Sequence, residues 1–339
     1  MHRDTQPAIP LTVIGGYLGA GKTTLLNHIL NQAAGRRIAV LVNDFGAINI
    51  DARLITRHDG ETISLANGCI CCSLAAGFHT VLNALLERDP GPEHVIVEAS
   101  GVALPDKIAQ YGHMPGFRLD GVVVLVDVET IRARAHDKYV GKTVLRQLRG
   151  ADLLVLTKTD LVTAELTAAV HDWLRAIAPG ARIVMANHGE IPLAVVLGVD
   201  GAALDRNYGD EDGDSAEHAL GYDTMVIRLS HPSDGDAFRA AIAALPEGIL
   251  RGKGIVWLAD TPDCQAIFQL VGKRWSIKPG GPWGGQQPAT EVIFIGLPGC
   301  IDDDALAQAF AALSVEDPVG TAGRNTAGDA TAIMGGPAG

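Results

Sequence analysis

The residues best suited to chemistry lie near the start of the chain, in the glycine-rich segment Gly16–Thr24. This segment reads GYLGAGKTT and fulfils the phosphate-loop pattern G-x-x-x-x-G-K-[ST]. The apolar run Leu11–Ile14 precedes it and a run with helical spacing follows from Leu25, which is the strand–loop–helix context that the pattern requires. Backbone N–H groups of such a loop and the positive end of the helix dipole cradle phosphate oxygens. The sequence therefore predicts a nucleotide phosphate site.

Individual side chains of this segment have expected roles. Lys22 should reach the terminal phosphates, and the Thr23 hydroxyl should hold Mg²⁺. We expect both residues, together with Glu98, to be catalytic. The positions expected to contact the nucleotide are Gly16, Leu18, Gly19, Ala20, Gly21, Lys22, Thr23 and Thr24.

A second motif, Glu98–Gly101 with the sequence EASG, comes directly after the apolar run Val95–Val97. A carboxylate at the end of a strand can act on Mg²⁺ through its water shell, so Glu98 is a candidate Mg²⁺-side residue. Gly101 can bring a backbone N–H close to a γ-phosphate, as in the D-x-x-G element of GTPases. The alternative is an ordinary carboxylate at the end of a strand.

A third motif, Thr157–Asp160 with the sequence TKTD, matches the guanine pattern [NT]-K-x-D. Asp160 can accept hydrogen bonds from the guanine N1–H and 2-amino group, and Lys158 can lie along the base. Adenine lacks that pair of donors and would leave a buried carboxylate unpaired, at a cost of a few kcal/mol. The motif therefore favours guanine over an adenine-specific ATPase or kinase, the alternative to the motif itself being a surface turn. Thr157 stands where many such motifs have Asn.

The segment Asn43–Asp51 follows the second apolar run of the chain. A loop at this place can reach the phosphate side and change shape with the nucleotide state. Asp44 is the candidate carboxylate for Mg²⁺ or for a second metal. An Asx residue that only forms a turn is the alternative.

A cluster of thiols, Cys69, Cys71 and Cys72, lies between the phosphate loop and Glu98. Structural zinc sites use separated pairs of ligands to close a tetrahedron, whereas Cys264 and Cys300 stand alone here. The cluster thus offers at most three sulfurs and leaves a fourth position open, which suits a site that loads and unloads. Thiolates favour Zn²⁺ or Cu(I) over Mg²⁺ or Ca²⁺. Redox activity and simple buried cysteines are the alternatives.

Composition narrows the class of protein. The chain has 339 residues and a net charge of −12, which disfavours a nucleic-acid binder because these usually carry a basic face. No apolar run approaches the roughly 20 residues needed to span a membrane, and the first ten residues lack a hydrophobic signal core. We therefore expect a cytoplasmic protein with neither nucleic acid nor membrane as a partner.

Continuous apolar runs alternate with helical patterns through the first part of the chain, which predicts an α/β domain with a doubly wound, mostly parallel sheet over residues 9–198. Because ligands bind beyond the carboxyl ends of such strands, the motifs above should meet there. The expected strands are Leu11–Ile14, Ile38–Val42, Val95–Glu98, Val122–Asp127, Leu153–Thr157 and Arg182–Ala186.

The pattern breaks at residues 199–221, which are polar, acidic and glycine-rich and are expected to form a flexible linker. A smaller α+β domain with an antiparallel sheet is expected over residues 222–314, and a disordered tail over 315–339. In this second domain we expect Gly280–Gly285 to be a loop. Its expected strands and helices are Met225–Leu229, Asp234–Leu245, Ile255–Leu258, Ala266–Val271, Val292–Ile295 and Asp302–Leu313.

The chain resembles the CobW-type GTPases, which belong with the urease and hydrogenase nickel-insertion GTPases. The motifs that carry the resemblance, in the family's order, are Gly16–Thr24, Asn43–Asp51, Gly68–Cys72, Glu98–Gly101 and Thr157–Asp160. Residues 250–257 also resemble the signature strand of the CobW C-terminal domain. The resemblance covers about residues 10–313.

The resemblance implies a cytoplasmic GTPase that uses Mg²⁺ and GTP, binds Zn²⁺ (or Co²⁺) at the cysteine loop and delivers it to a client metalloenzyme. It implies that Mg²⁺-GTP orders the switch loops, and a nucleotide-dependent homodimer is a further expectation. The family's switch loop usually reads N-E-F-G-E, whereas Asp44 and Ala47 replace its two Glu residues here. Alanine cannot ligate a metal ion, so a contact made by that second carboxylate is absent from this chain.

Three hypotheses about function remain open from the sequence. The first is a metallochaperone GTPase with a slow intrinsic rate, because no water-positioning base or arginine finger is evident. The second is a dedicated activator of a cobalt or iron enzyme, of the cobalamin-synthesis or nitrile-hydratase type. The third is a redox-regulated GTP switch without a transferable metal.

Overall fold

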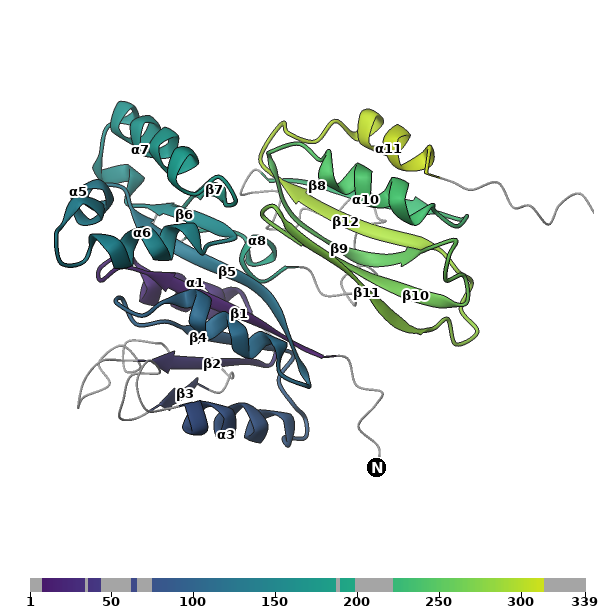
Figure 1. The fold of residues 1–339 in the computed structure, drawn as a ribbon, viewed down its shortest axis with the longest axis horizontal. Coiled ribbons are helices and arrows are strands. Elements are labelled where there is room, and N and C mark those ends of the chain that lie inside the picture. The colour runs from purple at the N-terminus through teal and green to yellow at the C-terminus, as the bar shows by residue number, and fades with distance from the viewer. Residues whose placement is uncertain are drawn as a thin grey trace, which may run out of the picture.

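The computed structural model describes residues 8–33, 36–43, 62–65, 75–186, 190–198 and 222–313, and they form two domains side by side (Figure 1). Asp44, Cys69, Cys71 and Cys72 lie outside these residues. No helix within these ranges is long and apolar enough to cross a membrane.

The first domain is built on a seven-stranded sheet in the order β3-β2-β4-β1-β5-β6-β7. All of its strand pairs are parallel. Its strands are β1 Ile9–Gly16, β2 Ile38–Asn43, β3 Thr62–Leu65, β4 His94–Glu98, β5 Phe117–Asp127, β6 Leu153–Thr157 and β7 Arg182–Met185. The sequence did not predict β3, because Thr62–Leu65 is too short and too polar to form a continuous apolar run.

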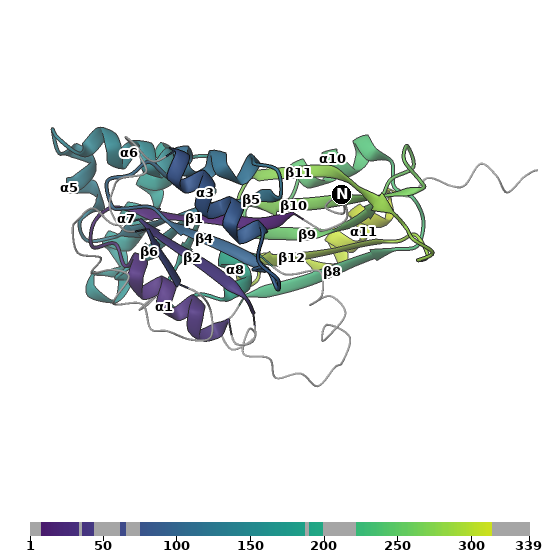
Figure 2. The ribbon, with the colours of Figure 1, turned by 90° about the horizontal axis from the view of Figure 1, so that it is seen from below.

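Helices cover both faces of this sheet, which confirms the predicted doubly wound architecture (Figure 2). The helices α1 and α8 pack in one apolar cluster, and the remaining helices pack in a second cluster on the other face. The helices are α1 Lys22–Gln32, α3 Ala75–Leu86, α4 Pro105–Ala109, α5 Ile131–His136, α6 Gly141–Arg149, α7 Ala164–Ile177 and α8 Leu193–Leu197, with 3-10 turns η1 Gln110–His113 and η2 Thr159–Leu161.

The second domain carries a five-stranded antiparallel sheet in the order β11-β10-β9-β12-β8, with two helices against one face (Figure 1). Phenylalanine rings fill the space between sheet and helices, as Phe238 meets Phe268 edge-on at 5.7 Å. This confirms the predicted α+β class. The elements are β8 Asp223–Leu229, α10 Gly235–Ala243, β9 Ile249–Trp257, β10 Cys264–Val271, β11 Arg274–Pro282, β12 Thr290–Gly296 and α11 Asp303–Ala311.

The strand β11, which ends at Pro282, corrects the first half of the loop predicted over Gly280–Gly285, whereas residues 283–285 lie outside any strand as predicted. Its last residues still pair with β10, because Pro282 lies opposite Cys264 across an irregularity in the register. The glycines and prolines concealed the strand in the sequence. Proline fits there because β11 is an edge strand, where one side of the backbone needs no partner.

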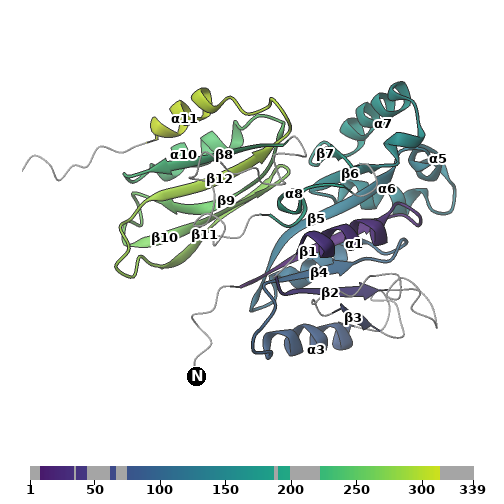
Figure 3. The same ribbon diagram turned by 180° about the vertical axis from the view of Figure 1, so that it is seen from behind.

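The domains meet where β9 and the β10–β11 turn approach the amino ends of the first sheet (Figure 3). Leu250, Ile293 and Ile295 of the second domain share an apolar cluster with α8. Arg251 of β9 is only 3% exposed and reaches into the first domain. We call this contact the domain junction. It consists of Arg251, Asp120, Thr12, His94, Arg118 and the carbonyls of Val195 and Val196.

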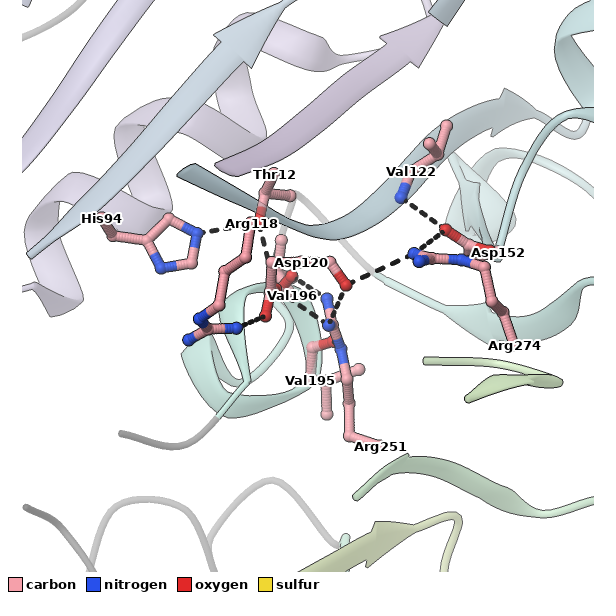
Figure 4. A network of polar contacts seen from close by, with 10 residues as sticks. All are labelled: Thr12, His94, Arg118, Asp120, Val122, Asp152, Val195, Val196, Arg251 and Arg274. Carbon is pink, nitrogen blue, oxygen red and sulfur yellow. Dashed lines mark hydrogen bonds and ion pairs between the residues drawn. The ribbon is translucent and has the colours of Figure 1, made fainter. Parts of the chain in front are cut away.

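Arg251 is satisfied on every side at the domain junction (Figure 4). Its Nε donates to the Val195 carbonyl at 2.7 Å and its NH1 to Asp120 Oδ2 at 2.9 Å, while NH2 donates to the Val196 carbonyl. Asp120 is the extra residue of β5 at a bulge opposite β1. The bulge therefore gives the carboxylate its place beside the second domain.

Candidate functional site

The phosphate loop joins β1 to α1 at the carboxyl edge of the first sheet. Gly21 is the N-cap of α1 with φ of 95°, a left-handed conformation that favours glycine. The Ala20 N–H donates to the Tyr17 carbonyl at 3.1 Å, which closes a turn within the loop. The helix therefore starts at Lys22, as the motif requires, with its free N–H groups at the loop.

The side chains of this loop differ in how they face solvent. Lys22 is 9% exposed, and its Nζ donates to the Gly16 carbonyl at 3.0 Å. Leu18 is 64% exposed. Gly16 and Ala20 are also buried, Thr23 is half-buried, and Gly19 and Thr24 are exposed. An ammonium folded back onto the loop's own carbonyl stands close to where a bound phosphate would lie.

The loop after β4 lies beside the phosphate loop, because β4 pairs with β1. Glu98 ends β4 opposite Ile14 and is 2% exposed. A Cβ added to Gly101 would lie 2.7 Å from the Leu18 backbone nitrogen, closer than real Cβ contacts come. Glycine at position 101 therefore permits the two loops to touch.

The guanine motif follows β6 and is tied to the phosphate loop. The Thr157 hydroxyl is within reach of two carbonyls, that of Ala20 at 3.0 Å and that of Val126 at 3.2 Å. Thr157 is itself buried. A threonine hydroxyl thus holds the motif against the phosphate loop at the position where many related motifs have Asn.

Lys158 has φ of 59°, the only positive value among the described non-glycine residues. Its Nζ donates to Asp127 Oδ2 at 2.7 Å, and Asp127 is buried at the end of β5. The other oxygen, Oδ1, accepts from the Glu129 N–H at 3.1 Å. Asp127 therefore fixes where the Lys158 side chain runs.

Asp160 corrects one detail of the sequence-based expectation. We expected a buried carboxylate, but Asp160 is exposed on the 3-10 turn η2. The reason is local, since β6 ends at Thr157 and the chain then turns outward. The desolvation that disfavours adenine therefore arises only when a base covers this carboxylate.

Two family descriptions match the chain. "CobW/HypB/UreG, nucleotide-binding domain" matches residues 10–185, and "Cobalamin synthesis protein cobW C-terminal domain" matches residues 222–314. The chain belongs to the CobW/HypB/UreG family. This confirms the resemblance drawn from the motifs.

Individual relatives align with nearly the full length of this chain. The protein "Zinc chaperone CobW" of Sinorhizobium sp is 32% identical over 92% of this chain and 99% of its own. "Zinc chaperone YjiA" of Escherichia coli is 32% identical over 90% of this chain and 98% of its own. A crystal structure of Zn(II)-bound YjiA GTPase from E. coli covers 91% of this chain and 100% of its own, with 25% identity and a TM-score of 0.44.

The thiol cluster of this CobW/HypB/UreG chain lies outside the described residues, as does Asp44. The helix α3 follows this segment and has Phe78, Leu82 and Leu85 buried. Within the described ranges, no group of three or more His, Cys, Asp or Glu residues is arranged to hold a metal ion. Cys264 and Cys300 of the second domain are free thiols.

Mg²⁺ is the ion that a CobW/HypB/UreG nucleotide site implies. Mg²⁺ prefers hard oxygen ligands and usually keeps several waters. Thr23 offers a half-buried hydroxyl, and Glu98 offers a buried carboxylate on the neighbouring strand. The Ser100 hydroxyl beside them is buried and has no hydrogen-bond partner among the described atoms. The donors present therefore fit this ion.

Two residues that lie beside these loops, Asp127 and Gln147, were not identified from the sequence. Asp127 is a carboxylate at the carboxyl end of a buried strand, the same signal that singled out Glu98. Gln147 of α6 is buried and donates to the loop after β4. Its signal is a polar residue in the apolar stripe that Val144 and Leu148 form along α6.

Proposed function

We propose that the chain is a GTP-hydrolysing metallochaperone that binds zinc, or a similar transition metal, at Cys69, Cys71 and Cys72 and transfers it to a client protein. The observation that carries the GTPase part is the hydrogen bond between Thr157 Oγ1 and the Ala20 carbonyl. This contact between the guanine motif and the phosphate loop supports a single site for one nucleotide. Relatives named zinc chaperones support the metal part, since they match both domains.

Hydrolysis in this proposal depends on positioning and on charge. Lys22 leaves the Gly16 carbonyl for the terminal phosphates, and the loop's backbone N–H groups stabilise negative charge that develops there. Gly101 offers its N–H to the γ-phosphate from the neighbouring loop. Mg²⁺ held by Thr23 and Glu98 would neutralise charge on the phosphate oxygens. The proposed intrinsic rate is slow, because the motifs contain no evident base for the attacking water.

The metal is cargo in this proposal, not a resident cofactor. Thiolates suit Zn²⁺ and related soft or borderline ions. A loop with three thiols leaves one position for water, for a carboxylate or for a client's ligand, so the ion can be passed on. Nucleotide and metal are coupled because each would favour one arrangement of the intervening loops, and such coupling is reciprocal.

The proposed client is a metalloenzyme. Relatives in Dictyostelium discoideum and Schizosaccharomyces pombe carry the name "Zinc-regulated GTPase metalloprotein activator 1", which supports a client protein of that class. We place the protein in the cytoplasm, because thiols that load and unload a metal need a reducing compartment. A nucleotide-dependent homodimer is part of the same proposal.

A titration with Co²⁺ as a spectroscopic probe tests the proposal. We expect thiolate-to-Co²⁺ absorption, tighter binding with a non-hydrolysable GTP analogue than with GDP, and weaker binding in Cys71→Ala. The matched control is Cys264→Ala, which removes an exposed thiol of the second domain and should change nothing. Equal Co²⁺ affinity with both nucleotides would overturn the coupling. A reversible disulfide without stoichiometric metal would favour a redox switch instead.

A further inference from the structure

Gln147 is a buried amide that connects helix α6 to the loop after β4. It is 2% exposed, although it lies on a helix with charged neighbours. Its Nε2 donates to the Gly101 carbonyl at 3.1 Å and to the Ala103 carbonyl at 2.7 Å. Both of its amide hydrogens are therefore used on one short stretch of backbone.

That stretch is the loop that touches the phosphate loop. The Ala103 N–H donates to the Ser100 carbonyl at 2.9 Å, which closes a turn over these residues. Gly101, the second residue of the turn, lies against the Leu18 backbone. The turn is thus held between the phosphate loop and α6, and Gln147 is its attachment to the helix.

Gln147 lies in apolar surroundings, where burial of a polar side chain is unfavourable. Val144 and Leu148, in the same stripe of α6, belong to the apolar cluster of that sheet face. A buried amide without hydrogen bonds there would cost free energy, whereas an apolar residue would not. A polar residue at this position is therefore explained by what it holds. The carbonyls that it holds belong to the Glu98–Gly101 motif and its turn.

We propose that Gln147 is a positioning residue for GTP hydrolysis, which fixes the Gly101 turn so that its backbone N–H meets the γ-phosphate. The inference rests on the proposed GTPase function. GDP has no γ-phosphate, so Gln147 acts on the GTP state and leaves GDP binding unchanged. Without the amide the turn keeps its contact with Leu18 but loses its link to α6, and a small misplacement at a reacting centre slows chemistry strongly.

The decisive variant is Gln147→Met, which keeps the length of the side chain and removes both donors. We expect single-turnover GTP hydrolysis to fall by about tenfold to a hundredfold, within the effect of a misplaced catalytic group. The affinity for a non-hydrolysable GTP analogue should fall roughly fivefold, the size of a hydrogen bond lost. The affinity for GDP should stay at its wild-type value. A structural defect alone would weaken both nucleotides alike, which would overturn the proposal.

The variant Gln147→Glu is the second test and decides if Gln147→Met is too unstable to assay. An ionised carboxylate cannot donate to the two carbonyls, whereas the protonated form donates to one of them. Burial raises the pKa of such a carboxyl, so the hydrolysis rate relative to wild type should rise as the pH falls from about 8 to about 6. A relative rate that is independent of pH, or a ratio of GTP-analogue to GDP affinity equal to wild type at pH 8, would overturn the proposal.

Two controls separate this inference from the proposed function. Arg146→Met removes the exposed ion pair of the neighbouring residue with Asp106, at 2.9 Å, and should leave hydrolysis unchanged. Lys22→Ala tests the GTPase itself. If wild type shows no hydrolysis that depends on Lys22, the proposed function fails. If Lys22 is required but Gln147→Met hydrolyses GTP at the wild-type rate, only the role of Gln147 fails.

Discussion

The strands β1, β4 and β5 carry different groups at their carboxyl ends and at their amino ends. At their carboxyl ends, β1 leads into the phosphate loop, β4 ends at Glu98 and β5 ends at Asp127. At their amino ends, β1 carries Thr12, β4 begins at His94 and β5 carries Asp120, which joins Arg251 of the second domain (Figure 4). We call the carboxyl ends of these strands, with the loops that follow them, the nucleotide edge. The sheet connects this edge directly to the domain junction.

The two ends differ in how their polar groups are satisfied. At the junction, the Thr12 hydroxyl has one proton and donates it to Asp120 at 3.2 Å, so it accepts from His94 Nε2 at 2.8 Å. At the nucleotide edge, Asp160, Gly19 and Leu18 face solvent. Asp120 and Arg251 at the junction bind groups of the protein itself, whereas the nucleotide edge offers exposed groups to a ligand. We therefore expect junction variants to change stability and edge variants to change nucleotide chemistry.

The largest expected effect is the loss of stability in Arg251→Met. The change removes the nearest positive charge from buried Asp120, which keeps only the longer contact to Arg118 at 3.6 Å, and removes the donors for the Val195 and Val196 carbonyls. Removing one partner of a buried pair costs about 3–5 kcal/mol. Urea unfolding, followed by a probe in each domain, measures this loss.

The double variant Arg251→Met with Asp120→Leu sharpens that prediction. Replacing both charges by apolar groups should recover much of the lost stability, because a buried ion pair is often no better than a well-packed apolar pair. Destabilisation equal to the sum of the single changes would contradict a coupled pair. GDP affinity should stay at its wild-type value in any of these variants that fold. A loss of GDP affinity that parallels the loss of stability would contradict the idea that the junction and the nucleotide edge act separately.

At the nucleotide edge, the strongest expected effect is that of Lys22→Ala on hydrolysis. Lys22 is the buried ammonium of the phosphate loop, and losing a preorganised charge of this kind costs about 10²–10³-fold in kcat. The folded state loses one hydrogen bond to the Gly16 carbonyl, worth about 1 kcal/mol. Single-turnover kinetics and urea unfolding of the same preparation compare the effects. If the free energy of unfolding falls by more than the activation free energy of hydrolysis rises, the contrast between the two ends is wrong.

The nucleotide edge was visible in the sequence because its parts are continuous motifs. Gly16–Thr24, Glu98–Gly101 and Thr157–Asp160 each form one loop after one strand, and the order of parallel strands then brings the loops together. The apolar runs predicted most strands for a related reason, since a strand buried on both faces needs little from distant residues. Local pattern was sufficient at this end of the sheet.

The domain junction was not visible, because its partners are far apart in the chain and most are backbone carbonyls. Arg251 joins Asp120 and the carbonyls of Val195 and Val196, and no spacing in the sequence marks such a set. The same holds for Gln147, which acts on the carbonyls of Gly101 and Ala103. A carbonyl acceptor is present at every residue, so its use depends on tertiary structure alone.

A smaller effect is expected for Asp127→Asn, within the nucleotide edge itself. The substitution removes the charge that holds Lys158 Nζ at 2.7 Å. Lys158 is partly exposed, so the pair contributes about 1 kcal/mol, or roughly fivefold in GDP affinity. The hydrolysis rate at saturating GTP should not change, because the phosphate end is untouched. Fluorescent GDP displacement measures the affinity.

The control for this prediction is Asp137→Asn, which removes a carboxylate of the same region that accepts from the Tyr139 and Val140 N–H groups. It should leave GDP affinity at its wild-type value. If Asp127→Asn instead lowers the hydrolysis rate and leaves GDP affinity intact, Asp127 serves the phosphate side and the division of roles along this edge is wrong.

The smallest expected effect is the pH dependence that Asp120 gives to stability. Burial alone would raise the pKa of Asp120, but the charges of Arg251, His94, Arg118 and Lys253 outweigh it, so the pKa lies below its ordinary value. The folded state therefore holds the carboxylate more strongly ionised than the unfolded chain does. This contribution is fully present above the unfolded pKa of about 3.9 and is lost as the pH falls through the lower folded value.

The measurement is the difference in unfolding free energy between wild type and Asp120→Asn across this acid range. Wild type should be the more stable at neutral pH, and the difference should shrink as the pH falls below about 4. Asp236→Asn, which changes a highly exposed carboxylate of the second domain, should show no such convergence. A constant difference down to the lowest pH at which the chain is folded would mean that Asp120→Asn destabilises the fold through the shape of the new side chain. The junction would then owe its stability to packing around α8 rather than to charge.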